Sequence, residues 1–121
     1  MTEALINLEI FNRFLESVNG DIDFLDEMLE TFFKDSPRQI EDMHTALKAS
    51  NYEDLMRAAH SLKANSAVFG AGVLSAQCKH LEGLAKSGAI DAQDAAQYIN
   101  RIEEAYQLAC LELKRIRAAM F

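Results

Sequence analysis

The chain has 121 residues and a formal net charge of −7, and 50% of its residues are hydrophobic. This length predicts one domain, spanning residues 1–121, with a single core. The acidic balance argues against nucleic acid as a partner, because binding to a phosphate backbone requires a basic face. No apolar run approaches the roughly 20 residues of a membrane span, and the first residues lack the basic region of a signal peptide. We therefore expect a cytoplasmic protein that does not enter a membrane.

Apolar residues recur at helical spacing along most of the chain, and β-branched residues are sparse, which favours helix nearly everywhere. In chain order the predicted apolar stripes are Leu8, Phe11, Leu15 and Val18; Leu25, Met28, Leu29, Phe32 and Phe33; Ile40, Met43 and Leu47; Leu55, Ala59, Leu62, Ser66 and Phe69; Leu74, Cys78, Leu81 and Ala85; and Ile99, Ile102, Tyr106, Ala109, Leu113, Ile116 and Met120. Cys78 and Cys110 form no C-x-x-C pair, so two reduced, buried thiols are expected.

Several short segments predict where these helices begin and end. Residues 36–39 (Ser-Pro-Arg-Gln) look like a capping box with proline at the first helical position, so this region forms either two helices or one helix kinked at the proline. Residues 50–53 offer a second capping box, and Asp91 can cap the last helix. Gly70-Ala71-Gly72 and Ser87-Gly88 are each expected to end the helix that precedes them.

Four long helices with short loops predict an all-α protein, an antiparallel up-down four-helix bundle. The first stripe, which ends near residues 19–20, is expected to form a short accessory N-terminal helix.

His60 lies on the wrong face of its helix for a core residue. With about 100° of rotation per residue, it points roughly 150° away from the inward stripe. The residues that share its outward face are Met56, Arg57, Lys63, Ala64 and Ala67. This face carries no acid closer than Glu53, although the protein is acidic, and its small and apolar residues suit a docking partner. An ordinary solvated histidine is the alternative. Lys63, one turn on, can place an ammonium beside a group attached to the ring.

Other chemistries find little support in the sequence. A di-iron bundle needs paired Glu-x-x-His motifs, and Glu41 with His44 is a single pair, so no metal site is expected. His44 is expected at the core boundary, and His80 on the surface. No glycine-rich phosphate loop is present, so the chain has no evident means of binding ATP. No third group completes a hydrolytic triad with His60 and a nearby serine.

The residues around His60 are, in order, Ala59, His60, Leu62, Lys63, Ser66, Gly70 and Ala71. This pattern resembles the motif of the histidine phosphotransfer (Hpt) domain of multistep two-component phosphorelays. Ala64 departs from it, because the family usually has glycine there; both are small, so the space beside the ring should survive. The resemblance continues in residues 24–40 and 78–82 and extends over roughly residues 8–118.

The resemblance implies a phosphocarrier with no kinase activity of its own. His60 would accept a phosphoryl group from the aspartate of one receiver domain and pass it to the aspartate of another. Lys63 would offset the negative charge of that group. The expected partners are receiver domains of hybrid histidine kinases and response regulators, which bring their own Mg²⁺, so the chain needs no cofactor. We expect it to be monomeric.

Further residues are expected to support this site. Glu82 or a water molecule would orient the second ring nitrogen. The remaining expected supporting positions are Ala64, Ser66 and Gly70, and the expected docking positions are Met56, Ala67 and Ile22, with Ile10 and Phe14 as further candidates. For Ile10 and Phe14, the alternative is that they pack the accessory helix onto the bundle.

A second function remains open on the sequence alone. The chain could be a helical adaptor that binds a receiver or kinase without accepting phosphate, although the intact pair of His60 and Lys63 argues against this. The initial methionine and the lack of linker sequence favour a freestanding protein.

Overall fold

The computed structural model describes residues 4–88 and 90–120, which form five α-helices connected by short loops. These helices are α1 (Leu8–Ser17), α2 (Ile22–Lys48), α3 (Tyr52–Val68), α4 (Gly72–Ser87) and α5 (Ala92–Ala119). The predicted all-α class is confirmed. The predicted single domain also includes residues 1–3, 89 and 121, which lie outside the described residues, and it stays a prediction.

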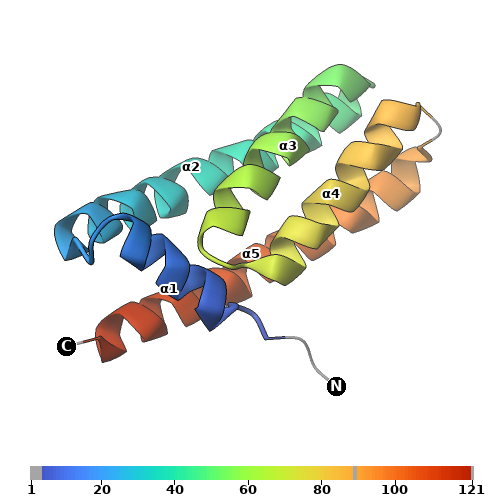
Figure 1. The fold of residues 1–121 in the computed structure, drawn as a ribbon. Coiled ribbons are helices and arrows are strands. Elements are labelled where there is room, and N and C mark those ends of the chain that lie inside the picture. The colour runs from blue at the N-terminus through green and yellow to red at the C-terminus, as the bar shows by residue number, and fades with distance from the viewer. Residues whose placement is uncertain (1–3, 89, 121) are drawn as a thin grey trace.

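The four longer helices pack around a common core. Contacts join α2 to α3, α3 to α4, α4 to α5 and α5 to α2. Successive helices run in opposite directions, and α1 lies at the end of the molecule where α2 begins and α5 ends (Figure 1). The arrangement is consistent with the expected four-helix bundle, with α1, which contacts α3, as the accessory helix. None of the described helices is long and apolar enough to cross a membrane.

Helix α2 runs unbroken through Ser36 and Pro37, so the capping box expected at residues 36–39 was wrong. Of the two alternatives, one continuous helix is observed. An interior proline costs about 3 kcal/mol, but the buried stripe of α2 continues on both sides of it. Buried residues that belong to this stripe are Leu25, Leu29, Phe32, Ile40 and Met43. Most helical stability in proteins comes from such packing rather than from local propensity.

The start of α3 is displaced by one residue from its prediction. Asn51, not Ser50, caps the helix: its Oδ1 accepts a hydrogen bond from the backbone N–H of Asp54 at 3.1 Å, and its Nδ2 donates to Asp54 Oδ2 at 2.8 Å. Ser50 instead has a φ of 52° in the preceding turn. Asp91 caps α5 as predicted, accepting from the N–H groups of the second and third helical residues.

The predicted apolar stripes account for most of the core. The inward residues of α3, which are Leu55, Ala59, Leu62 and Ser66, and its C-cap Phe69 are all at most 2% exposed. Cys78 and Cys110 are buried and free, as expected. Leu8 departs from its stripe and is exposed. The burial of the α3 stripe confirms the predicted rotation of this helix, which directs His60 outward.

Gly70 lets the chain turn from α3 into α4 while the segment before α1 passes closely over it. Its φ is +80°, and a Cβ at this position would lie 2.5 Å from the backbone oxygen of Asn7. The Gly70 carbonyl accepts a hydrogen bond from the Asn7 N–H at 2.8 Å. Both the backbone conformation and the close approach therefore require glycine.

A residue with a Cβ in the left-handed conformation costs about 1–2 kcal/mol. We expect Gly70→Ala to lower the free energy of unfolding by more than this, because its Cβ would also meet the Asn7 backbone. Gly20 is a matched control, because its φ is +69° and no atom lies within 4 Å of a Cβ built there. Chemical denaturation of both alanine variants measures the difference. Equal destabilisation would show that the contact with Asn7 is not tight in solution.

Candidate functional site: His60, Lys63 and Glu82 on two helices

His60 projects from the middle of α3 into solvent, and its side chain is 61% exposed. Its neighbours in sequence, Ala59 and Leu62, are fully buried, so packing fixes the helix beneath the ring without covering it. In the described part of the chain, Nε2 of the ring has no hydrogen-bond partner. An exposed imidazole nitrogen on a rigid helix is available as a nucleophile.

Glu82 of α4 contacts both His60 and Lys63. Its Oε1 lies 3.1 Å from His60 Nδ1, and its Oε2 lies 2.7 Å from Lys63 Nζ. The carboxylate reaches α3 because Cys78, Leu81 and Ala85 bury the inner face of α4, which leaves Glu82 at the seam between the two helices. The face of α3 itself carries no nearby acid, as expected, but the fold supplies one from the next helix.

The charge state of Glu82 determines which nitrogen of the ring is free. The hydrogen bond from Lys63 lowers the pKa of Glu82 most; partial burial raises it, and the contact with His60 lowers it further. The net pKa is below the ordinary value, so the group is ionised at neutral pH. An ionised carboxylate only accepts hydrogen bonds, so the nitrogen that faces it must donate. In a neutral His60 ring, this contact favours the proton on Nδ1 and leaves the lone pair on Nε2.

The surroundings of the ring are small and partly apolar. A hollow of about 320 Å³ beside it is lined by Met56, Arg57, His60, Ser61 and Glu82. Met56 is half-buried, while Ala64 and Ala67, further along the same face of α3, are exposed.

Ser66 and Gly70 do not contact the ring. The Ser66 hydroxyl is buried and donates within α3, to the carbonyl oxygens of Leu62 at 2.7 Å and Lys63 at 3.0 Å. Sequence analysis missed Ser75 of α4, whose hydroxyl donates to the Lys63 carbonyl at 3.3 Å. The sequence pattern does not show which residue of α4 lies opposite which residue of α3. Ser66, Ser75 and Gly70 therefore support α3 rather than the reacting atoms.

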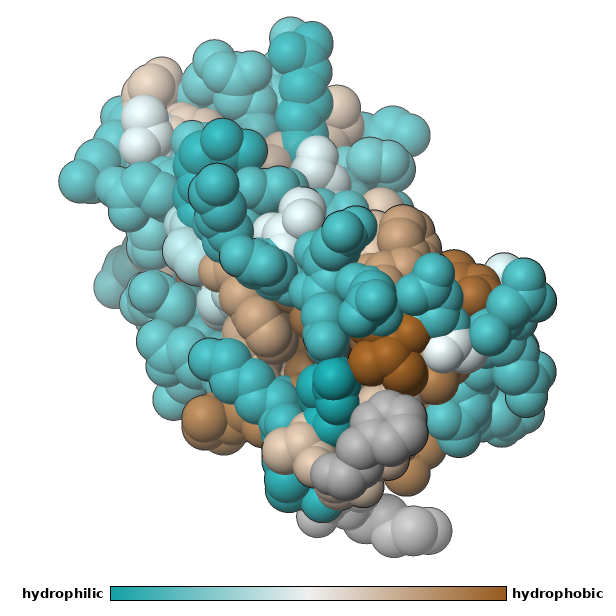
Figure 2. All heavy atoms as spheres, turned by 90° about the vertical axis from the view of Figure 1, so that its left-hand side faces the viewer, coloured by the Kyte–Doolittle hydropathy of each residue, from teal (hydrophilic) through white to brown (hydrophobic). Residues whose placement is uncertain are grey.

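The expected docking residues away from α3 lie at the end of the molecule where α1 packs. Figure 2 views this end, where apolar residues show between hydrophilic ones. Phe14 packs edge-to-face on Phe69 with ring centroids 5.5 Å apart. This contact supports packing of the accessory helix onto the bundle, rather than docking, as the role of Phe14. Ile10 is 37% exposed. Ile22, in the first turn of α2, is half-buried against the core, and no described contact links it to His60.

The other two histidines are engaged elsewhere. His44 Nε2 lies 3.8 Å from Glu103 Oε2 at the core boundary. The exposed His80 contacts the Tyr98 hydroxyl through Nε2 at 3.0 Å, with ring centroids 4.8 Å apart. Among the described residues, no three His, Cys, Asp or Glu side chains are placed to hold a metal ion.

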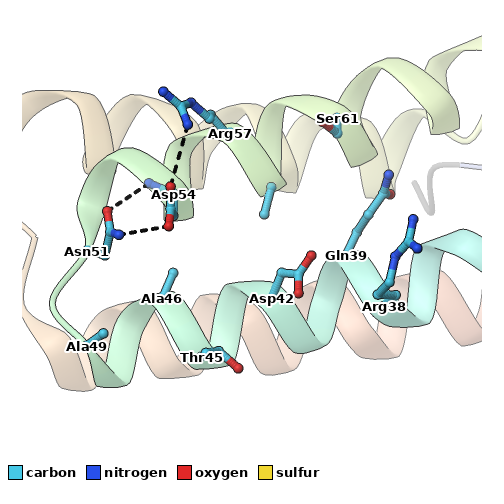
Figure 3. A pocket seen from close by; sticks show the side chains of 11 residues that line it. Arg38, Gln39, Asp42, Thr45, Ala46, Ala49, Asn51, Asp54, Arg57 and Ser61 are labelled. Atoms are coloured by element: carbon cyan, nitrogen blue, oxygen red, sulfur yellow. Dashed lines mark hydrogen bonds and ion pairs between the residues drawn. The ribbon is translucent and has the colours of Figure 1, made fainter.

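A larger hollow, of about 550 Å³, lies between α2 and α3 (Figure 3). Arg57, one of its charged side chains, bonds Glu53 at 2.7 Å and lies 3.7 Å from Asp54, which Asn51 holds at the start of α3. No histidine or cysteine lines it. It is therefore a polar surface groove that presents no reactive group.

The site is a single open histidine, paired with a lysine and a carboxylate, on an all-helical scaffold. The Hpt domain family model matches residues 27–119, and the chain belongs to this family. The structure is similar to that of histidine-containing phosphotransfer protein B (HptB) from Pseudomonas aeruginosa PAO1, with a TM-score of 0.85 and 27% identity over 99% of this chain and 100% of that one. No curated protein sequence matches the chain. These findings confirm the resemblance and support a histidine phosphotransfer role in phosphorelays.

Proposed function

We propose that the chain is a phosphocarrier that relays a phosphoryl group between receiver-domain aspartates, with His60 as the acceptor. The observation that carries the proposal is the open Nε2 of His60, whose opposite nitrogen faces Glu82 at 3.1 Å, in a chain of the Hpt family. It would act in the cytoplasm as a monomer and without a cofactor of its own.

In the proposed reaction, a receiver docks so that its aspartyl phosphate lies in line with Nε2. The lone pair of Nε2 attacks phosphorus while the bond to the aspartate oxygen breaks, and the reverse step on a second receiver passes the group on. The receiver would supply Mg²⁺, whose charge would offset that of the phosphoryl oxygens. The chain supplies the oriented nucleophile and the docking surface, so its contribution is positioning and electrostatics.

Lys63 would offset the negative charge of the phosphoryl group in transit and on the phosphorylated ring. It is bound to Glu82 at 2.7 Å and is 26% exposed. Its flexible four-carbon stem can carry the ammonium toward a group on Nε2, which lies on the open side of the ring.

We expect Lys63→Ala to slow transfer or shorten the lifetime of phosphohistidine with little change in melting temperature. Losing one charge-assisted contact costs about 1.5–3 kcal/mol, which is roughly ten- to hundredfold in rate if felt fully in the transition state. Transfer kinetics with a phosphorylated receiver measure the effect. Wild-type kinetics would mean that the lysine serves only as a partner of Glu82.

The direct test is incubation of the protein with a phosphorylated receiver. Phosphate that moves to this chain and is labile in acid but stable in alkali marks phosphohistidine. A complex that forms without any transfer would instead support the non-phosphorylated adaptor.

A further inference from the structure

The contact between Glu82 and His60 bears on the release of the phosphoryl group as well as on its acceptance. The carboxylate divides its two oxygens between His60 Nδ1, at 3.1 Å, and Lys63 Nζ, at 2.7 Å. The Glu82 side chain is only 21% exposed, whereas the His60 side chain is 61% exposed. The carboxylate is thus held beneath the ring, on the side away from the incoming phosphoryl group.

We infer that Glu82 keeps the proton on Nδ1 while Nε2 carries the phosphoryl group, so that a neutral imidazole leaves in the onward transfer. This inference rests on the proposed function and extends it to a positioning residue that sets how readily the phosphorylated ring gives up its phosphoryl group.

The bond changes balance without any proton transfer. When Nε2 forms its bond to phosphorus, the electron pair of the broken P–O bond stays on the aspartate, and the phosphorylated ring becomes a cation that faces Glu82. When the N–P bond breaks, its electron pair returns to Nε2 and the neutral ring is restored. A phosphorylated ring that had lost its Nδ1 proton would have to leave as an imidazolate anion, which is a much poorer leaving group.

The charged and titratable groups around this pair come from the same two helices. Lys63 opposes a positive ring, but its ammonium can move to the phosphoryl oxygens. Arg57 lines the hollow beside the ring and bonds Glu53. The Cys78 thiol, one turn before Glu82, stays neutral, because burial first and the Glu82 charge second raise its pKa to about 12. Glu82 is therefore the anion that faces the phosphorylated ring from α4.

Glu82→Gln separates charge from geometry, because the amide oxygen can still accept a hydrogen bond from Nδ1–H. Phosphoramidate can phosphorylate wild type and variant on histidine without any receiver. We expect the alkaline limb of the pH profile for onward transfer and hydrolysis to move down by about one pH unit in the variant, so that it loses its phosphoryl group about tenfold more slowly near pH 8. Nitrogen-15 NMR should find a proton on Nδ1 of the phosphorylated wild type near pH 8 and lose it in the variant.

Glu53→Gln is the matched control, since it removes an exposed carboxylate of α3 that pairs with Arg57 at 2.7 Å, and it should leave the profile unchanged. Superimposable profiles for wild type and Glu82→Gln, or faster loss from the variant, would overturn the inference. If the variant does not fold, the wild-type spectrum decides alone, because an unprotonated Nδ1 near pH 8 contradicts it. Failure of a phosphorylated receiver to label wild type would overturn the proposed function, whereas the phosphoramidate experiment would still test Glu82.

Discussion

His60→Gln should abolish phosphoryl acceptance from a phosphorylated receiver while the protein stays folded. Glutamine has no nucleophilic ring nitrogen, so no N–P bond can form at this position. The His60 side chain is 61% exposed, and substitution of such a surface residue usually changes the free energy of unfolding by no more than about 0.5 kcal/mol. The Gln amide can also donate to Glu82, which limits the loss further. Labelling with a phosphorylated receiver, followed by circular dichroism of the same sample, measures both quantities.

His44→Gln and His80→Gln are the matched controls, and both should still be labelled. His80 Nε2 faces the Tyr98 hydroxyl at 3.0 Å, and His44 lies at the boundary of α2 and α5 near Glu103. In both, Nε2 faces another side chain, unlike the open Nε2 of His60. Retained labelling of the His60 variant, or its loss in either control, would move the acceptor to another histidine.

Hydrophobic periodicity predicted the helices well because it records which side of each helix is buried. The inward residues of α3 alternate at steps of three and four, and that rotation alone directs His60 outward. Apolar residues recur on both sides of Pro37, so the pattern left one kinked helix open beside two separate helices. The capping box expected at residues 36–39 was wrong because it rested on local signals, whereas burial of the apolar stripe determines that the helix continues.

The polar contacts between helices were harder to predict, because they depend on the relative shift and rotation of two helices. Glu82 was considered as a partner for His60, but its simultaneous bond to Lys63 follows only from how α4 packs on α3. Ser75 was missed for the same reason. The choice of Asn51 over Ser50 as the cap of α3 depends on a single left-handed residue in a turn, and neighbouring side chains of similar capping strength do not determine it.

Ala67→Arg and Ala64→Gln should block transfer without unfolding the protein. Both alanines are exposed on the face of α3 that carries His60, one and two turns beyond it. The ring nitrogen must come within about 3–3.5 Å of phosphorus to react, and a misplacement of about 1 Å can cost a hundredfold in rate. A longer side chain on this face would hold a receiver further from Nε2 than that margin permits.

The same two substitutions are nearly neutral for the fold. Arginine and glutamine are good helix formers, so at exposed positions the free energy of unfolding should change by no more than about 0.5 kcal/mol. Transfer should therefore fall at least about a hundredfold while the circular dichroism spectrum and melting temperature stay unchanged. Ala76→Arg is the control, because Ala76 is exposed on α4 in a hollow with Lys79 and His80, away from the His60 hollow. It should transfer normally.

Two results would contradict docking of a receiver over Ala64 and Ala67. Earlier melting of the Ala64 or Ala67 variant would mean that these positions contribute to packing that their exposure does not reveal. Normal transfer by both variants would place the receiver on another side of His60. In that case the hollow formed with Met56, Ser61 and Glu82 becomes the approach to Nε2, and substitutions at Met56 rather than at the alanines should block it.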